Sequence, residues 1–410
     1  MARPDVPRGT KAHPAFVPAR PAVCDGASLG LGLVQRSPAS DRAADRAAHG
    51  AAGRTAGRTC LAAWVLSTAA FAGLAVAAPL DALQESGPHA KPKSGFVEIA
   101  LDRMNGKLDV LSLRPDWASG ADGFGDLAGW RLRGGYGLTD RAWLEAALFG
   151  RSLRYGSLEP SLAGWQVSGQ WRLQRGEPLL NSPDVSLRLS TWGNSAASVS
   201  RGSTTVGDVT VDGITVSNPR DRQWQLGPVV SWSLGDVVLS VFGSAGRGEV
   251  SVGKISARLG DTTLNWSGGQ FDVDGQPLGD LGQDLARSLG LDKELATVNY
   301  DFRFASAGFG LRYPVGNWQF RGGYEYVTIR RNGVDSVIAA RDTDNATYTA
   351  NHTLIGEAAY RFSRTAYVFL RGQAMSNQFL AEIPFLYNGL TARRFDEKYG
   401  LLSAGVVFGF

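Results

Sequence analysis

The sequence is poor in cysteine, with two residues in 410, and poor in charge, with 20 % of its residues charged. Both cysteines, Cys24 and Cys60, lie before residue 78, so a chain that starts there has no disulfide and no thiol nucleophile. The net charge of +4 comes from the N-terminal region: residues 1–77 hold nine Lys or Arg and four Asp or Glu, which leaves 33 and 34 for residues 78–410. That balance gives no support for nucleic-acid binding.

The first 77 residues divide into two parts. Residues 1–53 are rich in Ala, Arg, Pro and Gly without periodicity, which predicts a disordered leader or a start codon placed too far upstream. Residues 54–77 have the order of a secretory signal peptide: two arginines, an apolar run and a small-residue ending before Ala78. As a transmembrane helix this run would span only marginally, because it is mostly alanine with polar interruptions. We predict cleavage before Ala78 and an N-terminal tail at 78–94.

Apolar and polar residues alternate in repeated segments from residue 95 onward. Segment 165–173 places two tryptophans, a valine and a leucine on one face, and two glutamines, a serine and an arginine on the other. Segments 223–234 and 318–326 repeat this pattern. Side chains of a β-strand point alternately to opposite faces, so each segment predicts a strand with one apolar and one polar face.

The apolar face is rich in aromatic residues near the strand ends, whereas the core of a soluble sandwich is mostly aliphatic. Amphipathic rings at these positions suit the two membrane–water interfaces. Arg, Gln and Glu on the polar face suit a wet lumen. The alternation therefore predicts a transmembrane barrel that is polar inside and apolar outside.

Most of the predicted strands are at least as long as the roughly nine to eleven residues that a tilted strand needs to cross a bilayer. We place strands at 95–103, 128–138, 142–154, 163–173, 184–195, 222–234, 237–250, 298–313, 317–330, 351–362, 366–376 and 396–410. Short connections alternate with long ones at about 196–221, 251–297, 331–350 and 377–395. Short periplasmic turns and long extracellular loops produce this rhythm.

The predicted fold class is therefore all-β: over 95–410, a single antiparallel up-and-down transmembrane β-barrel of about 12 strands. An even strand number puts both termini, and the tail at 78–94, on the periplasmic side. The segments Phe96–Leu101 and Leu108–Leu113 compete for the first strand, so ten or fourteen strands stay open.

Two predicted strands change phase along their length. In 298–313 the aromatic residues occupy even positions up to Phe304 and odd positions from Phe309. A similar change occurs near Gly150–Leu153. A β-bulge at Ser306–Gly308 would restore a single lipid-facing side.

The last strand ends on Phe410, with Phe408, Val406, Ala404 and Leu402 on the same face. This pattern resembles the C-terminal signature of bacterial outer-membrane β-barrel proteins, a porin-like superfamily. The resemblance covers about ten residues. It implies a bacterial outer-membrane location, contact with outer-membrane lipids and lipopolysaccharide, and recognition by the barrel-assembly machinery through Phe410, Phe408 and Val406. It does not identify a solute.

Candidates for catalysis are few. After residue 77 the histidines are His89, before the first strand, and His352, at the loop end of a predicted strand. The simpler interpretation of His352 is an exposed residue at the rim of the barrel. The alternative is a residue that orients a catalytic nucleophile. Segment Asp342–Asn345 is rich in oxygen but lacks the Gly and distal Glu of a calcium loop. We predict no catalytic residue, metal site or cofactor, with an outer-membrane hydrolase as a minor alternative.

Arginine gathers on the predicted lumen face, in excess over carboxylates. The residues there are Arg131, Arg133, Arg172, Arg188, Arg303, Arg312, Arg321, Arg361 and Arg371, with Glu145, Asp301, Glu325 and Glu357. Unpaired guanidinium groups would favour anions in a pore. Paired groups would instead join the wall into ladders that close a narrow barrel, because the arginine fork binds carboxylates. Loops that fold inward would neutralise the excess.

We predict an outer-membrane channel that passes small solutes passively, anions being favoured by its arginines. The alternative is a non-conducting barrel with a structural, adhesive or surface-recognition role. Residues 280–291 predict a short amphipathic helix that would cover the barrel mouth, constrict the lumen or contact lipopolysaccharide. Asp212-Gly213 predicts a hairpin turn in loop 196–221. Whether barrels associate is open.

Overall fold

The computed structural model describes much of the chain after residue 82. The described residues are 83–85, 92–104, 126–154, 160–176, 182–201, 203–206, 209–288, 291–341, 347–377, 380, 382–388 and 398–410. The predicted leader and signal peptide, together with His89 and Asp342–Asn345, lie outside them.

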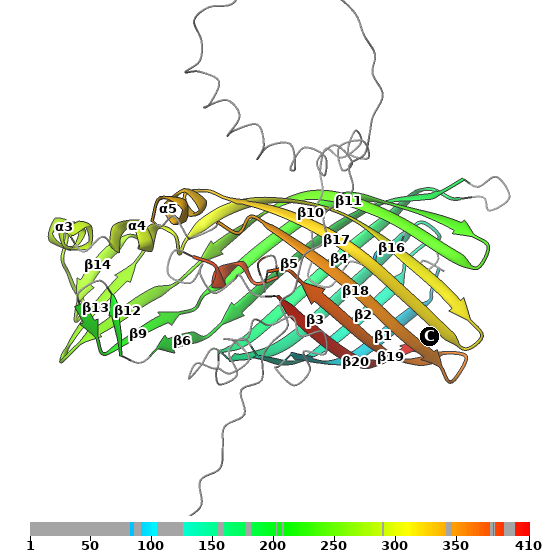
Figure 1. Ribbon diagram of the computed structural model, residues 1–410, viewed down its shortest axis with the longest axis horizontal. Coiled ribbons are helices and arrows are strands. Elements are labelled where there is room, and N and C mark those ends of the chain that lie inside the picture. Colours follow the sequence, from blue (N-terminus) through cyan, green and yellow to red (C-terminus); the bar gives the residue numbers. More distant parts are fainter. Residues whose placement is uncertain are drawn as a thin grey trace, which may run out of the picture. The chain divides into compact units, whose positions relative to one another are not determined.

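Twelve antiparallel strands form a closed barrel in the described part of the chain (Figure 1). They are β1 (Gly95–Met104), β2 (Asp126–Gly137), β3 (Ala142–Arg154), β4 (Ser161–Gln174), β5 (Asp184–Ala196), β10 (Arg220–Leu234), β11 (Val237–Ser251), β16 (Tyr300–Val315), β17 (Trp318–Arg331), β18 (Ala350–Arg361), β19 (Ala366–Met375) and β20 (Tyr399–Gly409). The predicted fold class is confirmed, and every predicted strand has its counterpart.

The barrel closes between its first and last strands. Phe96 of β1 lies opposite Gly409 of β20, and Arg103 lies opposite Leu402. Beyond the last pair, the Phe410 amide donates to the Gly95 carbonyl over 2.9 Å, and the return bond has the same length. The predicted segment at Phe96 is therefore the first strand.

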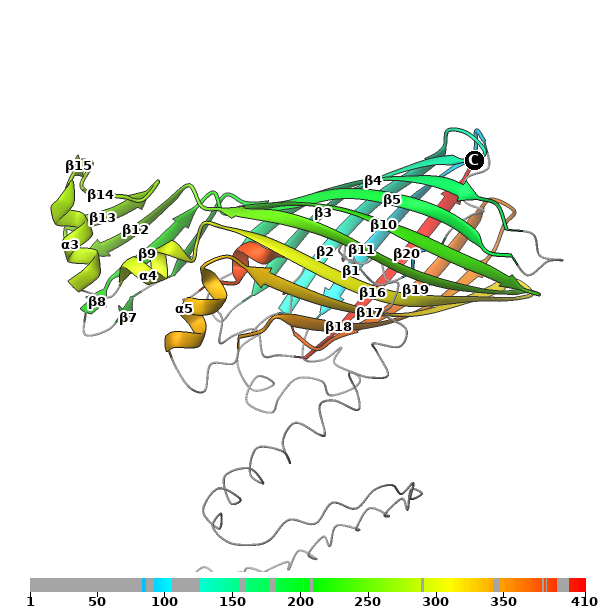
Figure 2. The same cartoon turned by 90° about the horizontal axis from the view of Figure 1, so that it is seen from above.

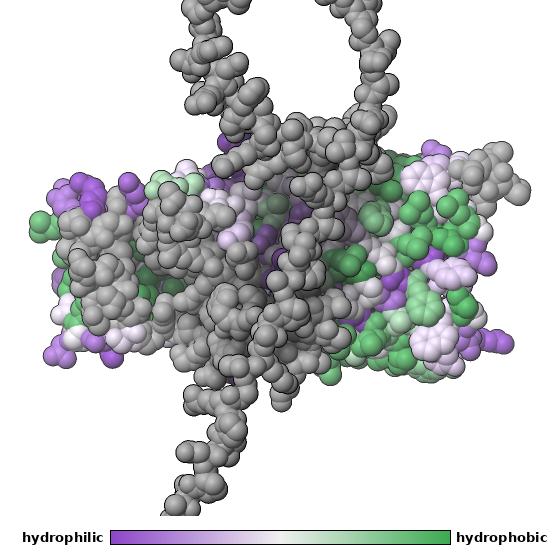
Figure 3. Space-filling view, viewed as in Figure 1, coloured by the Kyte–Doolittle hydropathy of each residue, from purple (hydrophilic) through white to green (hydrophobic). Residues whose placement is uncertain are grey.

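The outer wall is apolar because alternate side chains of each strand face away from the lumen. Every barrel strand exposes at least one large apolar side chain, and Leu138 and Phe362 are exposed in two of the short turns. Those on the strands include Leu101, Trp130, Leu148, Trp171, Leu189, Trp224, Val241, Phe309, Trp318, Leu354, Leu370 and Phe408. Figure 3 shows such side chains gathered over the barrel wall on the face in view. A wall of this kind is stable against lipid rather than water.

The predicted β-bulge in β16 is wrong. Residues 300–312 of β16 pair with β11 without a break in register, so even-numbered residues face inward along the whole strand. Phe302 therefore points into the lumen, where its ring lies over Gly248 of β11. In β3 the register is likewise unbroken, and the ring of Phe149 lies over Gly164 of β4. A glycine on the neighbouring strand leaves the space that an inward aromatic ring needs.

The long connections contain strands and helices of their own. A six-stranded sheet has the order β15 (Gln276–Pro277), β14 (Gln270–Val273), β13 (Thr262–Ser267), β12 (Lys254–Leu259), β9 (Gly213–Ser217) and β6 (Ser198–Arg201). In the chain β6 follows β5, β9 leads into β10, and β12 follows β11. Figure 2 shows β9 and β12 to β15 beyond the end of the barrel. The helices are α3 (Asp280–Ser288), α4 (Leu291–Ala296), α5 (Val334–Arg341) and the short 3-10 helix η3 (Pro384–Leu386).

Two loop predictions have different outcomes. The helix predicted from residue 280 is confirmed over Asp280–Ser288. The hairpin predicted around Asp212-Gly213 is wrong: β8 (Val209–Val211) pairs with β7 (Thr204–Val206), whereas β9 pairs with β6 and β12. Apolar residues of β9 are half-buried against the six-stranded sheet, and this packing overrides the local turn signal. Among the described residues, no helix is long and apolar enough to cross a membrane.

Candidate functional site

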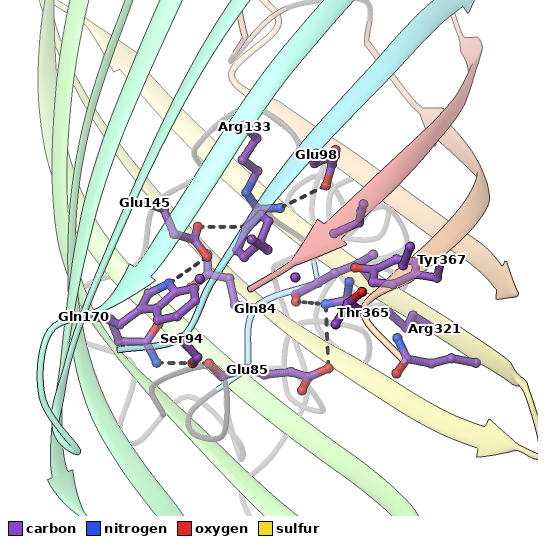
Figure 4. A pocket seen from close by; sticks show the side chains of 18 of the residues that line it. Gln84, Glu85, Ser94, Glu98, Arg133, Glu145, Gln170, Arg321, Thr365 and Tyr367 are labelled. Carbon is purple, nitrogen blue, oxygen red and sulfur yellow. Dashed lines mark hydrogen bonds and ion pairs between the residues drawn. The ribbon is translucent and has the colours of Figure 1, made fainter. Parts of the chain in front are cut away.

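A cavity of about 510 Å³ occupies the lumen at the short-turn end of the barrel. Seven of the predicted lumen residues line it: Arg133, Arg172, Arg188, Arg321, Arg361, Arg371 and Glu145. Figure 4 shows Arg133, Glu145 and Arg321 extending from different parts of the wall toward this space. The arginine-rich surface predicted by alternation therefore gathers around one cavity.

Residues 83–85 of the predicted N-terminal tail also line this cavity. The Glu85 carboxylate lies 3.0 Å from the Arg312 guanidinium and 3.6 Å from that of Arg321. Gln170 donates to the Glu85 carbonyl over 3.0 Å, and Arg321 donates to the Leu83 carbonyl over 2.9 Å. The tail thus brings a carboxylate to two lumen arginines, which Figure 4 shows for Arg321.

Arginines and carboxylates alternate in a connected circuit around the lumen. The Glu357 carboxylate lies 2.6 Å from Arg371 and 3.5 Å from Arg321, which also contacts Glu85. Arg371 continues to Glu98 at 3.8 Å. The circuit therefore joins β17, β18, β19 and β1 to the N-terminal segment.

The same circuit continues on the other side of Glu98. Arg133 lies 3.9 Å from Glu98 and 2.8 Å from Glu145, and Arg188 lies 3.2 Å from Glu145. Arg131 also reaches Glu98, at 3.2 Å. The six arginines of the circuit share four carboxylates, Glu85, Glu98, Glu145 and Glu357, so most of the positive charge is offset within the wall and the guanidinium forks tie neighbouring strands together.

The long-loop half of the lumen has a different character, because it is filled by an apolar core. Inward residues of the strands pack there with residues of the β19–β20 connection. The buried members are Met104, Leu127, Leu153, Leu162, Trp192, Ala196, Val250, Tyr300, Phe302, Phe304, Val327, Ile329, Val334, Ile338, Met375, Leu380, Ile383, Phe385, Tyr387, Tyr399 and Leu401. We call the residues 380–388 that the structure describes, namely 380 and 382–388, the inserted segment.

Polar contacts fix the inserted segment to the wall. The Glu382 carboxylate lies 3.1 Å from Arg151 of β3, and Asn194 of β5 donates to the Glu382 carbonyl over 2.8 Å. The Tyr300 hydroxyl lies 2.8 Å from the Pro384 carbonyl and 3.0 Å from that of Tyr387. The inserted segment is therefore attached to β3, β5 and β16 at once.

Tyr387 completes this attachment. The Arg331 guanidinium lies 3.9 Å from the centre of its ring, and the Tyr348 amide donates to its hydroxyl over 3.2 Å. Burial raises the pKa of Tyr387, and the neighbouring Arg331 charge opposes that rise. The ring is thus held as a neutral phenol within the core.

Two predicted lumen residues face the other way. Arg303 and Asp301 are exposed on the outer wall, because Phe302 and Phe304 occupy the inward positions of β16. The prediction that Arg303 faces the lumen is therefore wrong. Its error follows from the assumption that aromatic residues always face lipid.

The other predicted residues lie inside. Glu325 is buried and accepts a hydrogen bond of 2.9 Å from Ser306. Sequence reasoning missed Glu98 and Asp102, although the inward parity of β1 carries the signal once Phe96 is accepted as its start. It also missed Arg151, which the phase change of β3 concealed, and Glu382, which no periodic pattern marks.

His352 lies on the outer wall, away from the lumen cavity. Its Nδ1 atom lies 2.7 Å from the Tyr324 hydroxyl, and its ring is 5.0 Å from that of Tyr326. In the described ranges no group of three or more His, Cys, Asp or Glu is placed to hold a metal ion. His352 therefore belongs to an aromatic cluster on the barrel surface.

No family model matches the chain, and no curated protein matches it. Solved structures similar to it include translocator domains and porins. The translocator domain of the autotransporter NalP from Neisseria meningitidis is 12 % identical, with a TM-score of 0.44, over 87 % of this chain and 97 % of that one. The β domain of the Bordetella autotransporter Brka is 9 % identical, with a TM-score of 0.40, over 78 % and 99 %. The porin NanC is 9 % identical, with a TM-score of 0.36, over 76 % and 98 %.

Proposed function

We propose that the protein is a bacterial outer-membrane β-barrel whose lumen is sealed to diffusing solutes and whose long loops present a folded surface outside the cell. The apolar outer wall supports the membrane location, since exposed Leu, Trp, Phe and Val side chains on every barrel strand need lipid contact. The short turns then face the periplasm and the long connections face outward.

The inserted segment is the observation that carries the sealed lumen. Leu380, Ile383, Phe385 and Tyr387 are almost fully buried among inward residues of the wall. Burial of side chains of this size contributes about 1.5–3 kcal/mol each. Opening the lumen would expose all four side chains together. The open state therefore has a high free energy and is sparsely populated.

The charge circuit supports the same conclusion. An anion-selective pore needs guanidinium groups that face the solute without nearby carboxylates. Here Glu98, Glu145 and Glu357 each contact at least two arginines, and Glu85 contacts Arg312 and shares Arg321 with Glu357. The arginines act mainly as links between strands in this proposal.

The external surface supports a recognition role. The six-stranded sheet has its own core of Ile255, Trp266 and Phe271, together with Val298. Within it, Asn265 donates to Asp272, and this bond lowers the pKa of the Asp272 carboxyl. Binding residues are often carried by loops that a rigid scaffold positions, and a folded core of this kind supplies such a scaffold.

A gated anion channel is the second candidate, favoured by the arginine-lined cavity of about 510 Å³. In that case displacement of the inserted segment would connect the cavity to the exterior. Small anions would then pass along Arg133, Arg188 and Arg321.

Single-channel recording in planar bilayers tests the proposal. We expect no conductance steps from the wild-type protein. Regular steps from it would overturn the sealed lumen and favour the channel. The double variant Ile383→Asp/Phe385→Asp places two charges in the apolar core and expels the inserted segment. Leu281→Asp, at an exposed position of α3, is the control for an added charge.

The double variant separates the two candidates further. Steps from it, with a reversal potential in a KCl gradient that favours chloride, would show that the seal covers an anion pathway. Silence from both proteins would support a barrel that is closed along its length.

A further inference from the structure

Three arginines lie side by side on the outer wall near the long-loop end of the barrel. In the strand register Arg247 of β11 is opposite Arg303 of β16, which is opposite Arg330 of β17. All three are exposed. Directly opposed side chains have Cβ atoms about 4.5–5.5 Å apart, so three positive charges share one patch. We call these residues the arginine row.

The arginine row has no carboxylate partner in the part of the chain that the structure describes. Glu249 and Asp301 face each other in the next row outward, and neither forms an ion pair with it. The Arg247 guanidinium instead lies 5.2 Å from the centre of the Trp224 ring. Like charges directly opposite one another destabilise a sheet, so an external anion would relieve the repulsion.

The height of the row fits a lipid headgroup. Along β17 the outward residues run from Trp318, near a short turn, through Tyr324 and Tyr326 to Arg330. Twelve residues of a strand tilted by about 40° rise about 30 Å along the membrane normal. The apolar band of such a barrel is about 25 Å tall and is bordered by aromatic residues. Arg330 therefore lies just above the band, at the level of headgroup phosphates.

We propose that Arg247, Arg303 and Arg330 bind the phosphate of a phosphorylated glycolipid in the outer leaflet. Guanidinium forks bind phosphate oxygens in pairs, and three forks suit a single dianionic group. The wall below the row continues with Tyr326 and His352, which would contact the acyl chains of the same molecule. A free phosphate ion would use only the upper part of this surface. The inference rests on the proposed membrane location but not on a sealed lumen.

Native mass spectrometry of the intact protein in detergent micelles tests the proposal. We expect bis-phosphorylated lipid A to bind about tenfold more tightly than the same lipid without phosphates, a ratio that one charge-assisted hydrogen bond supplies. The triple variant Arg247→Gln/Arg303→Gln/Arg330→Gln should lose this preference and still bind lipid through the wall.

The control removes the same charge elsewhere: Arg258→Gln/Arg287→Gln/Lys293→Gln changes three exposed residues of the loop between β11 and β16. It should keep the preference for phosphate. Equal binding of both lipids by the wild type, or equal loss in both triple variants, would overturn the proposal. Displacement of the lipid by inorganic phosphate at millimolar concentration would show a site for free anions instead. Conductance is measured separately, so failure here leaves the sealed lumen unaffected.

Discussion

The carboxylate of Glu382 lies 3.1 Å from the guanidinium of Arg151, and the two side chains are 7 % and 1 % exposed. These residues are 231 positions apart in the sequence, one in the β19–β20 connection and the other on β3. Their pairing fastens the inserted segment across the lumen. Gln373 also donates to the Glu382 carboxylate over 3.3 Å, but Glu382 is the residue that forms an ion pair with Arg151, so each charge depends on the other for compensation.

Replacement of Glu382 by Ala should strongly destabilise the barrel, because Arg151 would keep a buried charge without its ion-pair partner. Removal of one member of a buried pair costs about 3–5 kcal/mol. The free energy of unfolding is measured by urea titration in lipid vesicles with tryptophan fluorescence.

The double variant Arg151→Met/Glu382→Leu is the matched test of this pair. It removes both charges and keeps the side-chain volume, so most of the lost stability should return. A double variant as unstable as Glu382→Ala would show that the pair itself matters little and that Glu382 acts through its other contacts.

Tyr300→Phe should loosen the inserted segment without unfolding the barrel. The change removes the hydroxyl that contacts the Pro384 and Tyr387 carbonyls, worth about 1 kcal/mol as a net hydrogen bond. Backbone hydrogen exchange at Leu386 and Tyr387 should become faster by about five- to tenfold. Tyr313→Phe, on the exposed wall, should leave both rates unchanged. Equal acceleration in the two variants would contradict a specific role of Tyr300.

The period-two pattern was sufficient to predict the barrel, because every strand needs one face for lipid along most of its length. In β10, for example, Trp224, Leu226 and Trp232 face outward as their alternation with Gln and Ser predicts. The pairing of the strand at Phe96 with β20 could likewise be anticipated, since a closed barrel must join its two terminal strands, although closure alone does not set their register.

The apolar core that fills the long-loop half of the lumen could not be predicted in the same way. Alternation shows which residues share a face but not whether that face meets lipid or a core. Phe302 and Phe304 are as apolar as lipid-facing residues, yet they pack inward against Trp192 and the inserted segment. The position of Glu382 depends on tertiary contacts alone. The glycine partners of the inward rings, such as Gly248 beneath Phe302, were the available sequence signal.

Phe410→Ala should slow assembly of the barrel by the assembly machinery while it leaves the folded wall almost unchanged. The Phe410 side chain is exposed beyond the last pair of β20, so its loss costs little packing in the folded state. Insertion is followed in vesicles that contain purified barrel-assembly complex. Phe362→Ala removes another exposed phenylalanine after β18 and should insert at the wild-type rate. Equal slowing by both changes would indicate a general effect of lost apolar surface rather than a C-terminal signal.

Glu85→Gln should raise the affinity of the lumen cavity for a small dianion. The change removes the carboxylate that lies 3.0 Å from Arg312 and 3.6 Å from Arg321. Arg321 keeps a second carboxylate, that of Glu357, at 3.5 Å. An anion that replaces this contact gains a charge-assisted bond, so sulfate should bind about tenfold more tightly in isothermal titration. Glu249→Gln makes the same charge change on the exposed wall and should leave sulfate binding at the wild-type level. Unchanged affinity in Glu85→Gln would mean that the N-terminal segment does not neutralise these arginines in solution, and the two lumen guanidinium groups would then be open to solutes from the periplasmic side.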